Sequence, residues 1–225
     1  MSPNKLRILL LSDVIDRRYD QKWDEHCFDG IDLIISCGDL PARYLEFIAT
    51  MFHGDVLYVP GNHDERYVEH PPLGCICIDD QLINWHGLRI LGLGGAMGFH
   101  SNPYQLTEKQ MKKRVNKLWL SLRKHKGFDI LVTHAPAKGY HDGQDLCHQG
   151  FETFTQLIHQ YQPRYFFHGH VHFTYGDFPR LYTIENTTAI NGYSSYIVEI
   201  PFDLQNHTNL PFVKKTRALF QSSGF

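Results

Sequence analysis

The stretch GDVLYVPGNHD, residues 54–64, is the most informative about the fold class, because an apolar run stops abruptly in a glycine and three polar side chains. Short runs rich in Leu, Ile, Val and Phe that end in such punctuation predict strands buried on both faces. Four further runs have the same form and also end in polar residues: LRILLLSD (6–13), IDLIISCGD (31–39), FDILVTHAP (128–136) and PRYFFHGHVH (163–172). Ligands of α/β folds bind beyond the carboxyl ends of the strands, so these polar ends are the first candidates for a functional site.

Helical patterns lie between the predicted strands. Residues 41–51 and 107–126 are typical of amphipathic helices, and a third apolar stripe runs from Phe151 to Tyr161. The second of these opens on Thr107 with Gln110 three residues later, which is the spacing of a capping box. Strands that alternate with helices predict an α/β architecture.

The middle and the end of the chain favour antiparallel strands instead. The alternation in 74–95, with HG at 86–87, predicts a hairpin, and 180–202 predicts one or two more strands. We expect one domain over 1–225, with a helical insertion at about 98–126 and a C-terminal tail at about 214–225 that has little to pack against.

The composition narrows the classes of partner. The 225 residues are 42% hydrophobic, and 22 basic and 24 acidic residues give a net charge of −2, which does not favour nucleic acid or anionic membrane as a partner. No apolar run approaches the ~20 residues of a membrane-spanning helix. Five cysteines, an odd number, and no signal-peptide pattern predict reduced thiols and a soluble, cytoplasmic protein.

The polar residues at the strand ends mix hard oxygen donors with imidazoles, a ligand set that suits manganese, iron or zinc. They are Asp39, Asn62, His63, His134, His170 and His172. A metal held by such residues could activate water and neutralise charge on a phosphoryl oxygen, and two metals about 3.5–4 Å apart could do so on the attacking and leaving oxygens together.

The ordered series D…GD…GNHD…H…GHVH over residues 13–172 resembles the calcineurin-like metallophosphoesterase superfamily. The resemblance implies a four-layer α/β/β/α sandwich with two mixed β-sheets. It also implies hydrolysis of a phosphate mono- or diester by a metal-bound hydroxide, without a covalent enzyme intermediate. The spacing in THAPAKGYHDG (133–143) and the GHVH loop are similar, more loosely, to the small branch that includes the class III nucleotide phosphodiesterases.

The resemblance also assigns roles residue by residue. Asp39 would bridge two metals, such as Mn²⁺ or iron, with Zn²⁺ as a further candidate. Asn62, His134 and His170 would complete the second metal site, and Asp13 and His172 would belong to the first. His63 would stabilise the transition state or protonate the leaving alkoxide, with Asp64 orienting its ring.

One position departs from the family pattern, whose first block is Asp, any residue, His. Here the block is Asp13, Val14, Ile15, so one imidazole of the first metal site is missing. Asp16 could replace it, water could fill the gap, or only the second metal could bind. We expect a first metal still held by Asp13, Asp39 and His172, because a buried carboxylate without a cation is poorly compensated.

A rival hypothesis is a catalytically weakened scaffold protein that keeps the fold and binds partners through its surface, as some members of the superfamily do. The retained His63 argues for an enzyme, because this residue has no use without chemistry. A nuclease is least favoured, because the sequence offers no basic groove.

We expect a small phosphorylated substrate, a nucleotide or another phosphoester, flanked by basic residues at Arg17, Arg18, Arg43, Arg66 and Lys138. His168 falls within a strand and is expected in the core, whereas His100 and His141 lie in loops that could line the site. The sequence leaves the substrate itself and the oligomeric state open.

Overall fold

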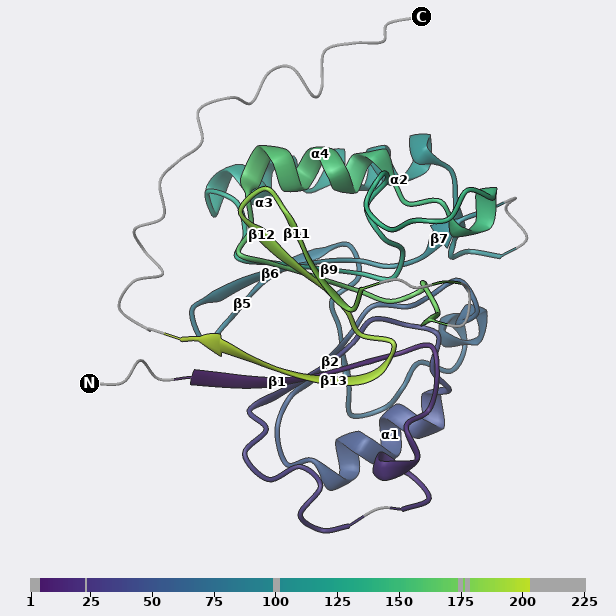
Figure 1. The fold of residues 1–225 in the computed structure, drawn as a ribbon, viewed down its shortest axis with the longest axis vertical. Helices are drawn as coiled ribbons and strands as arrows, with labels where there is room; N and C mark the ends of the chain where they lie inside the picture. Colours follow the sequence, from purple (N-terminus) through teal and green to yellow (C-terminus); the bar gives the residue numbers. More distant parts are fainter. Residues whose placement is uncertain (1–4, 23, 99–101, 174–175, 177–178, 203–225) are drawn as a thin grey trace, which may run out of the picture.

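Two mixed β-sheets lie face to face at the centre of the protein (Figure 1). The structure is a computed structural model and describes residues 5–22, 24–98, 102–173, 176 and 179–202. The first sheet has the order β13-β1-β2-β3-β4, in which all neighbours are parallel except β13 and β1. Its strands are β1 (Lys5–Ser12), β2 (Leu33–Ser36), β3 (Val56–Tyr58), β4 (Ile76–Cys77) and β13 (Ser194–Pro201).

The second sheet has the order β11-β12-β10-β9-β6-β5. Its central neighbours are parallel, and an antiparallel hairpin closes each edge. Its strands are β5 (Gln81–Trp85), β6 (Leu88–Leu93), β9 (Ile130–Thr133), β10 (Tyr165–His168), β11 (Leu181–Ile184) and β12 (Thr187–Asn191). A separate short pair joins β7 (Ala96–Met97) and β8 (Gln105–Leu106) in parallel.

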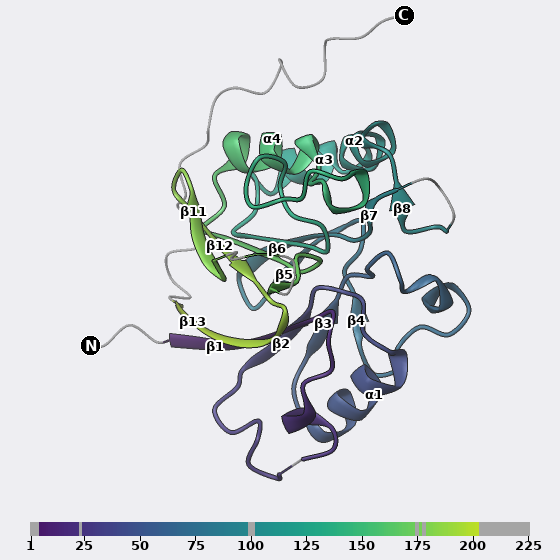
Figure 2. The same ribbon diagram turned by 45° about the vertical axis from the view of Figure 1, so that its right-hand side comes forward.

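Helices cover the outer face of each sheet. Figures 1 and 2 show α1 on the first sheet, and α2, α3 and α4 together on the second. The helices are α1 (Ala42–Met51), α2 (Glu108–Lys117), α3 (Trp119–Lys124) and α4 (Glu152–Tyr161), with 3-10 turns η1 (Arg17–Tyr19), η2 (Glu65–Val68) and η3 (Leu146–His148). The arrangement confirms the predicted four-layer α/β/β/α sandwich with two mixed sheets.

The central strands β1, β2, β3 and β9 are apolar because both of their faces are buried. In β1, Ile8 and Leu10 pack between the two sheets, whereas Leu9 and Leu11 pack toward α1. Successive side chains of a strand point to opposite faces, so a strand in the middle of four layers needs an unbroken apolar run.

The helix expected over 107–126 begins as predicted but is divided. The Thr107 side chain accepts a hydrogen bond from the Gln110 N–H, and the Gln110 side chain accepts one from the Thr107 N–H, so the capping box is present. At Leu118 the backbone tightens, because its N–H donates to the carbonyls of Val115 and Asn116. A new helix then starts and returns Leu122 to the core. The described part of the interval 98–126, predicted as a helical insertion, holds β8, α2 and α3.

The predicted hairpin over 74–95 is shorter than expected. The antiparallel pair β5–β6 turns at His86 and Gly87, as the sequence indicates, but β4 pairs in parallel with β3 in the other sheet. The interval 180–202, predicted to hold one or two antiparallel strands, holds three: β11 and β12 pair antiparallel, β13 pairs antiparallel with β1, and β12 also pairs in parallel with β10. The predicted tail at about 214–225 lies outside the described residues. Within the described part of the chain, no helix combines the length and the apolar character needed to cross a membrane.

Candidate metal centre

The predicted site residues follow the carboxyl ends of five strands. Asp13 follows β1, Asp39 follows β2 and Asn62 follows β3, and these strands are parallel neighbours in the first sheet. His134 and His170 follow the parallel strands β9 and β10 of the second sheet. Because the two sheets face each other with these ends on one side, loops that are distant in the sequence meet there.

His134 is fully buried and is held from both sides of its ring. Its Nδ1 lies 2.8 Å from the carbonyl oxygen of Cys37, so this nitrogen must carry a hydrogen and donate it. Its Nε2 lies 3.2 Å from Asp39 Oδ2 and 3.1 Å from Asn62 Oδ1. The backbone carbonyl therefore fixes the tautomer and directs Nε2 at two oxygens.

His170 is oriented in the same manner from the opposite side. Its Nε2 donates to the carbonyl of Cys147 over 2.7 Å, and its Nδ1 lies 3.1 Å from Nε2 of His134. The residue stands in the left-handed region, with φ 66°. The two imidazoles thus present their remaining nitrogens to one point.

The donor set at that point fits a divalent cation. Ligand atoms of Asp39, His134 and His170 lie within 4.8 Å of one another, and the Asn62 oxygen joins them. Two ring nitrogens and two oxygens face each other, and backbone carbonyls hold the rings through their other nitrogens, as in known metal–histidine sites. Nitrogen and oxygen donors of this kind suit first-row metals. We call these four residues the second-site corner.

In the second-site corner, a proton on His134 interacts with the Asp39 carboxylate and shifts the pKa values of the neighbouring groups. Burial lowers the pKa of His134, but the Asp39 carboxylate outweighs this effect and raises the pKa to about 9. Burial raises the pKa of Asp39, yet the charge of His134 and its hydrogen bond hold it below its usual range. Burial, reinforced by the His134 charge, lowers the pKa of His170 to about 4. A metal binding here would take the place of the proton on His134.

Asp13 and His172, predicted for the first metal, lie together beside this corner, and we call them the first-site corner. Both carboxylate oxygens of Asp13 accept from the His170 N–H at 3.0 Å, and one lies 3.4 Å from His172 Nε2. The Asp13 side chain is 1% exposed, whereas the His172 side chain is 29% exposed and lies against the Tyr193 ring. Asp13 is therefore buried at the centre of the site, whereas His172 lies at its partly exposed edge.

Ile15, which departs from the family pattern, points away from the metal site. Ile15 packs, half-buried, into the apolar cluster between the first sheet and α1. Asp16 accepts from the Arg18 side chain at 2.7 Å and from the Ser195 hydroxyl at 2.5 Å, and it caps η1. Both Asp16 oxygens are engaged, so service as a metal ligand would require these contacts to break.

His63 and Asp64 do not form the expected orienting pair. The Asp64 carboxylate turns inward and accepts from the backbone N–H groups of Asp39 and Gly61, each at 2.7 Å. Among the described residues, no hydrogen bond joins it to the His63 ring, which is exposed. Asp64 instead ties the loop after β2 to the loop after β3, and burial raises its pKa to about 7.

The backbone of the site is strained where ligands leave the strands. Asp13, Asp39 and His170 all have φ between 58° and 66°, a left-handed conformation that few residues other than glycine adopt. Glycines allow the close approaches beside them: a Cβ on Gly61 would lie 2.1 Å from Asp39 Oδ1, and one on Gly169 would lie 1.9 Å from the Ser12 hydroxyl.

The sequence did not indicate that His148 lies beside the site, whereas it correctly predicted His168 in the core. His148 stacks on His170 at 5.4 Å between ring centroids and pairs with Asp145 at 2.7 Å, although its loop has no periodic pattern that signals this. His168 is a core histidine, as expected, bonded to the Gly169 carbonyl and the Tyr182 hydroxyl. His141 is exposed, and its ring contacts Tyr182. His100 lies outside the described residues.

Comparison with known proteins bears on both fold and family. The profile of the calcineurin-like phosphoesterases matches residues 6–173 of this chain. A crystal structure that is 13% identical covers 87% of this chain and 95% of its own length, with a TM-score of 0.64. The crystal structure of TT1561 from Thermus thermophilus is 17% identical and covers 85% and 90%, with a TM-score of 0.57. No curated protein sequence matches.

Proposed function

Because this chain belongs to the calcineurin-like phosphoesterase family, we propose that it is a metal-dependent hydrolase of phosphate esters. One observation carries the proposal. Two imidazoles, a carboxylate and an amide oxygen converge in the second-site corner, and backbone carbonyls orient both imidazoles. Buried acceptors that face one another in this way are stabilised by a cation.

The proposed ligand roles follow the placement of the side chains. Asp39 would bridge, the other members of the second-site corner would hold one metal, and Asp13 and His172 would hold the other with Asp39. The nitrogen and oxygen donors favour Mn²⁺ or iron, with Zn²⁺ as a further candidate. Such ions neutralise charge on phosphoryl oxygens and lower the pKa of water.

His63 would act on the substrate rather than on the metal. Its backbone N–H donates to Asp39 Oδ1 at 2.8 Å, which holds the residue at the edge of the site. Its ring is exposed and, among the described residues, makes no hydrogen bond, so it can approach the leaving oxygen and donate a proton. Asp64 would position this loop through Gly61.

Elemental analysis of protein purified without chelator tests the proposal together with turnover. We expect bound metal and manganese-stimulated hydrolysis of p-nitrophenyl phosphate or bis(p-nitrophenyl) phosphate. His63→Ala should lower kcat by about 100-fold and leave the metal content unchanged. The matched control is His53→Ala, an exposed histidine after α1 that lies outside the site. Absence of metal and of turnover, with His63→Ala equal to wild type, would contradict the proposal.

A weakened scaffold protein remains the second candidate, and the observation that favours it is Ile15. If the protein binds metal but hydrolyses neither ester, while His63→Ala changes nothing, the scaffold hypothesis takes precedence. Turnover that depends on His63 excludes it.

A further inference from the structure

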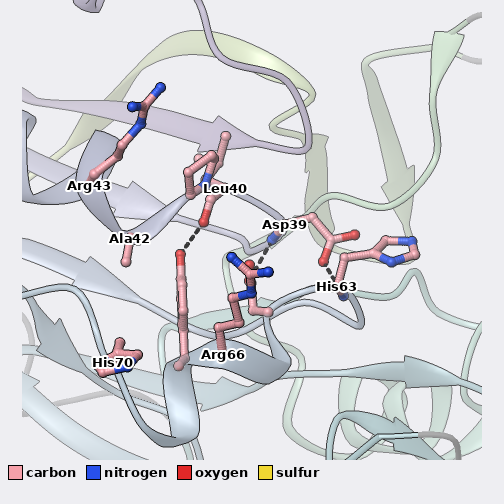
Figure 3. Close-up of a pocket in the computed structure, with 10 residues that line it drawn as sticks. Asp39, Leu40, Ala42, Arg43, His63, Arg66 and His70 are labelled. Carbon is pink, nitrogen blue, oxygen red and sulfur yellow. Dashed lines mark hydrogen bonds between the residues drawn. The ribbon is translucent and has the colours of Figure 1, made fainter.

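A pocket of about 570 Å³ opens beside Asp39 and His63 and extends along the start of α1 and along η2 (Figure 3). We propose that this pocket binds a second phosphate group, so that the substrate is a small molecule that carries two phosphates. The inference rests on the proposed function, because it places the phosphate to be hydrolysed at Asp39 and His63.

The pocket is lined by basic side chains that form no ion pair within the described part of the chain. Arg43 comes from the first turn of α1, Arg66 from η2, and His70 follows η2. In Figure 3, Asp39 and His63 lie on one side, Arg43 and His70 lie on the other, and Arg66 lies between them. Among the described residues, neither guanidinium forms a hydrogen bond or an ion pair.

Some other arginines of the protein have carboxylate partners. Arg89 donates to Asp129 at 2.6 Å, Arg18 donates to Asp16 at 2.7 Å, and Arg114 donates to Asp80 at 2.7 Å. Arg18 is thereby removed from the basic residues that the sequence suggested for phosphate binding. Arg43 and Arg66 are the two from that set that line the pocket.

The carboxylates of the pocket are engaged elsewhere. Asp39 interacts with His134 and with the His63 N–H, and Asp64 accepts from two backbone N–H groups. Neither neutralises the guanidinium groups, so an anion from solution would meet two cations that have no counter-ion among the described residues. Guanidinium groups bind phosphate oxygens in a bidentate manner.

Part of the pocket lining is apolar. Leu40, Pro41, Ala42 and Tyr67 form it, and the Tyr67 hydroxyl donates to the Leu40 carbonyl. Pro41 caps α1 without a side-chain hydrogen bond, so the N–H groups of the first turn add positive potential to the same wall. The volume lies in the range of small-molecule sites, about 300–1,000 Å³. A compact bisphosphate therefore fits better than a macromolecule.

Two substrates that differ by one phosphate provide the test. Adenosine 3′,5′-bisphosphate and AMP serve as probes with the manganese-loaded protein, and phosphate release is measured. We expect a KM at least about 10-fold lower for the bisphosphate. Arg43→Ala with Arg66→Ala should remove this difference between the two probes. Arg123→Ala, at an exposed position on α3, is the control.

Equilibrium binding separates this inference from the proposed function. Calorimetry in the His63→Ala background measures both probes while turnover is slow. Tighter binding of the bisphosphate that requires the two arginines supports the pocket even if no ester is hydrolysed. Equal binding of the two probes, or a double arginine variant that binds the bisphosphate like its parent, overturns it even if p-nitrophenyl phosphate is hydrolysed.

Discussion

The second-site corner and the first-site corner are neighbours, but their imidazoles are buried to different degrees. In the second-site corner each imidazole has a carbonyl partner that sets its tautomer, at 2.8 Å for His134 and 2.7 Å for His170. In the first-site corner, His172 is partly exposed and lies 3.4 Å from Asp13. A ligand can therefore be retained in the sequence without being buried at the centre of the site.

This contrast has a local cause. The loop after β1 sends Ile15 into the core beside α1 and commits Asp16 to Arg18 and Ser195. The first-site corner thus keeps a buried carboxylate without the imidazole that the family places two residues later. We propose that its metal binds more weakly than the metal of the second-site corner.

Removal of the best-held ligand should be the most damaging change. His134→Ala deletes the imidazole that faces three other donors, so we expect loss of the second-site metal and at least about a 100-fold fall in turnover. Metal analysis and ester hydrolysis measure both. His141→Ala, an exposed histidine in a nearby loop, is the control. Unchanged metal content in His134→Ala would remove the distinction between the corners.

Removal of the Asp64 carboxylate, which links the loops after β2 and β3, should have the second-largest effect. Asp64→Ala leaves two buried N–H groups, those of Asp39 and Gly61, without an acceptor, so we expect the free energy of unfolding to fall by about 2–3 kcal/mol. Urea unfolding of metal-free protein measures this loss. Its exposed neighbour provides the control, because Glu65→Ala should change the free energy by less than about 0.5 kcal/mol. Equal effects of the two substitutions would show that Asp64 does not organise the site.

Restoring the family pattern should make the two corners more alike. Ile15→His is expected to tighten first-site metal binding by about 10-fold and to cost about 1–2 kcal/mol of stability, because a polar ring replaces an apolar packing group. Metal titration followed by thermal unfolding measures both. Ile15→Val keeps the apolar contact and should leave metal affinity unchanged. An unaltered affinity in Ile15→His would mean that another group already completes the site.

A change at Asp16 should matter least. Burial raises the pKa of this carboxyl, but its hydrogen bonds with Arg18 and Ser195 outweigh that effect and lower the pKa from 3.8 to about 2. A carboxyl with a lowered folded-state pKa contributes stability above its unfolded pKa and loses that contribution as pH falls toward the folded value. Asp16→Asn should therefore cost about 1 kcal/mol near neutral pH, since Arg18 is largely exposed to solvent.

The pH dependence provides the measurement for Asp16. Urea midpoints compared between pH 6 and pH 3 should converge for wild type and Asp16→Asn as the pH falls. Glu69→Gln, an exposed carboxyl near η2, should show a constant difference from wild type. A constant difference for Asp16→Asn would indicate that its charge plays no part. It would also make Asp16 a candidate ligand again.

Some of this organisation could be predicted from the sequence because it depends on side-chain pattern. Apolar runs that end in Asp39, Asn62 and His134 indicate buried strands with polar ends, and parallel strands bring such ends together. The capping box at Thr107 is equally local, since both of its hydrogen bonds lie within four residues.

The remaining features depend on the backbone of distant segments. The carbonyl of Cys37 orients His134, 97 residues away, and no residue type signals a carbonyl position. The break at Leu118 follows no Gly or Pro and arises from packing against the second sheet. Asp64 was expected to face His63, but two N–H groups brought together by the fold attract it instead.

The bond between the His170 N–H and Asp13 spans 157 residues, from the first strand to the loop after β10. Such a contact joins the two sheets, so it can form only after they have come together. Metal capture would then be among the last events of folding. The bound ion would slow unfolding, because the two sheets could separate only after the ion had been released.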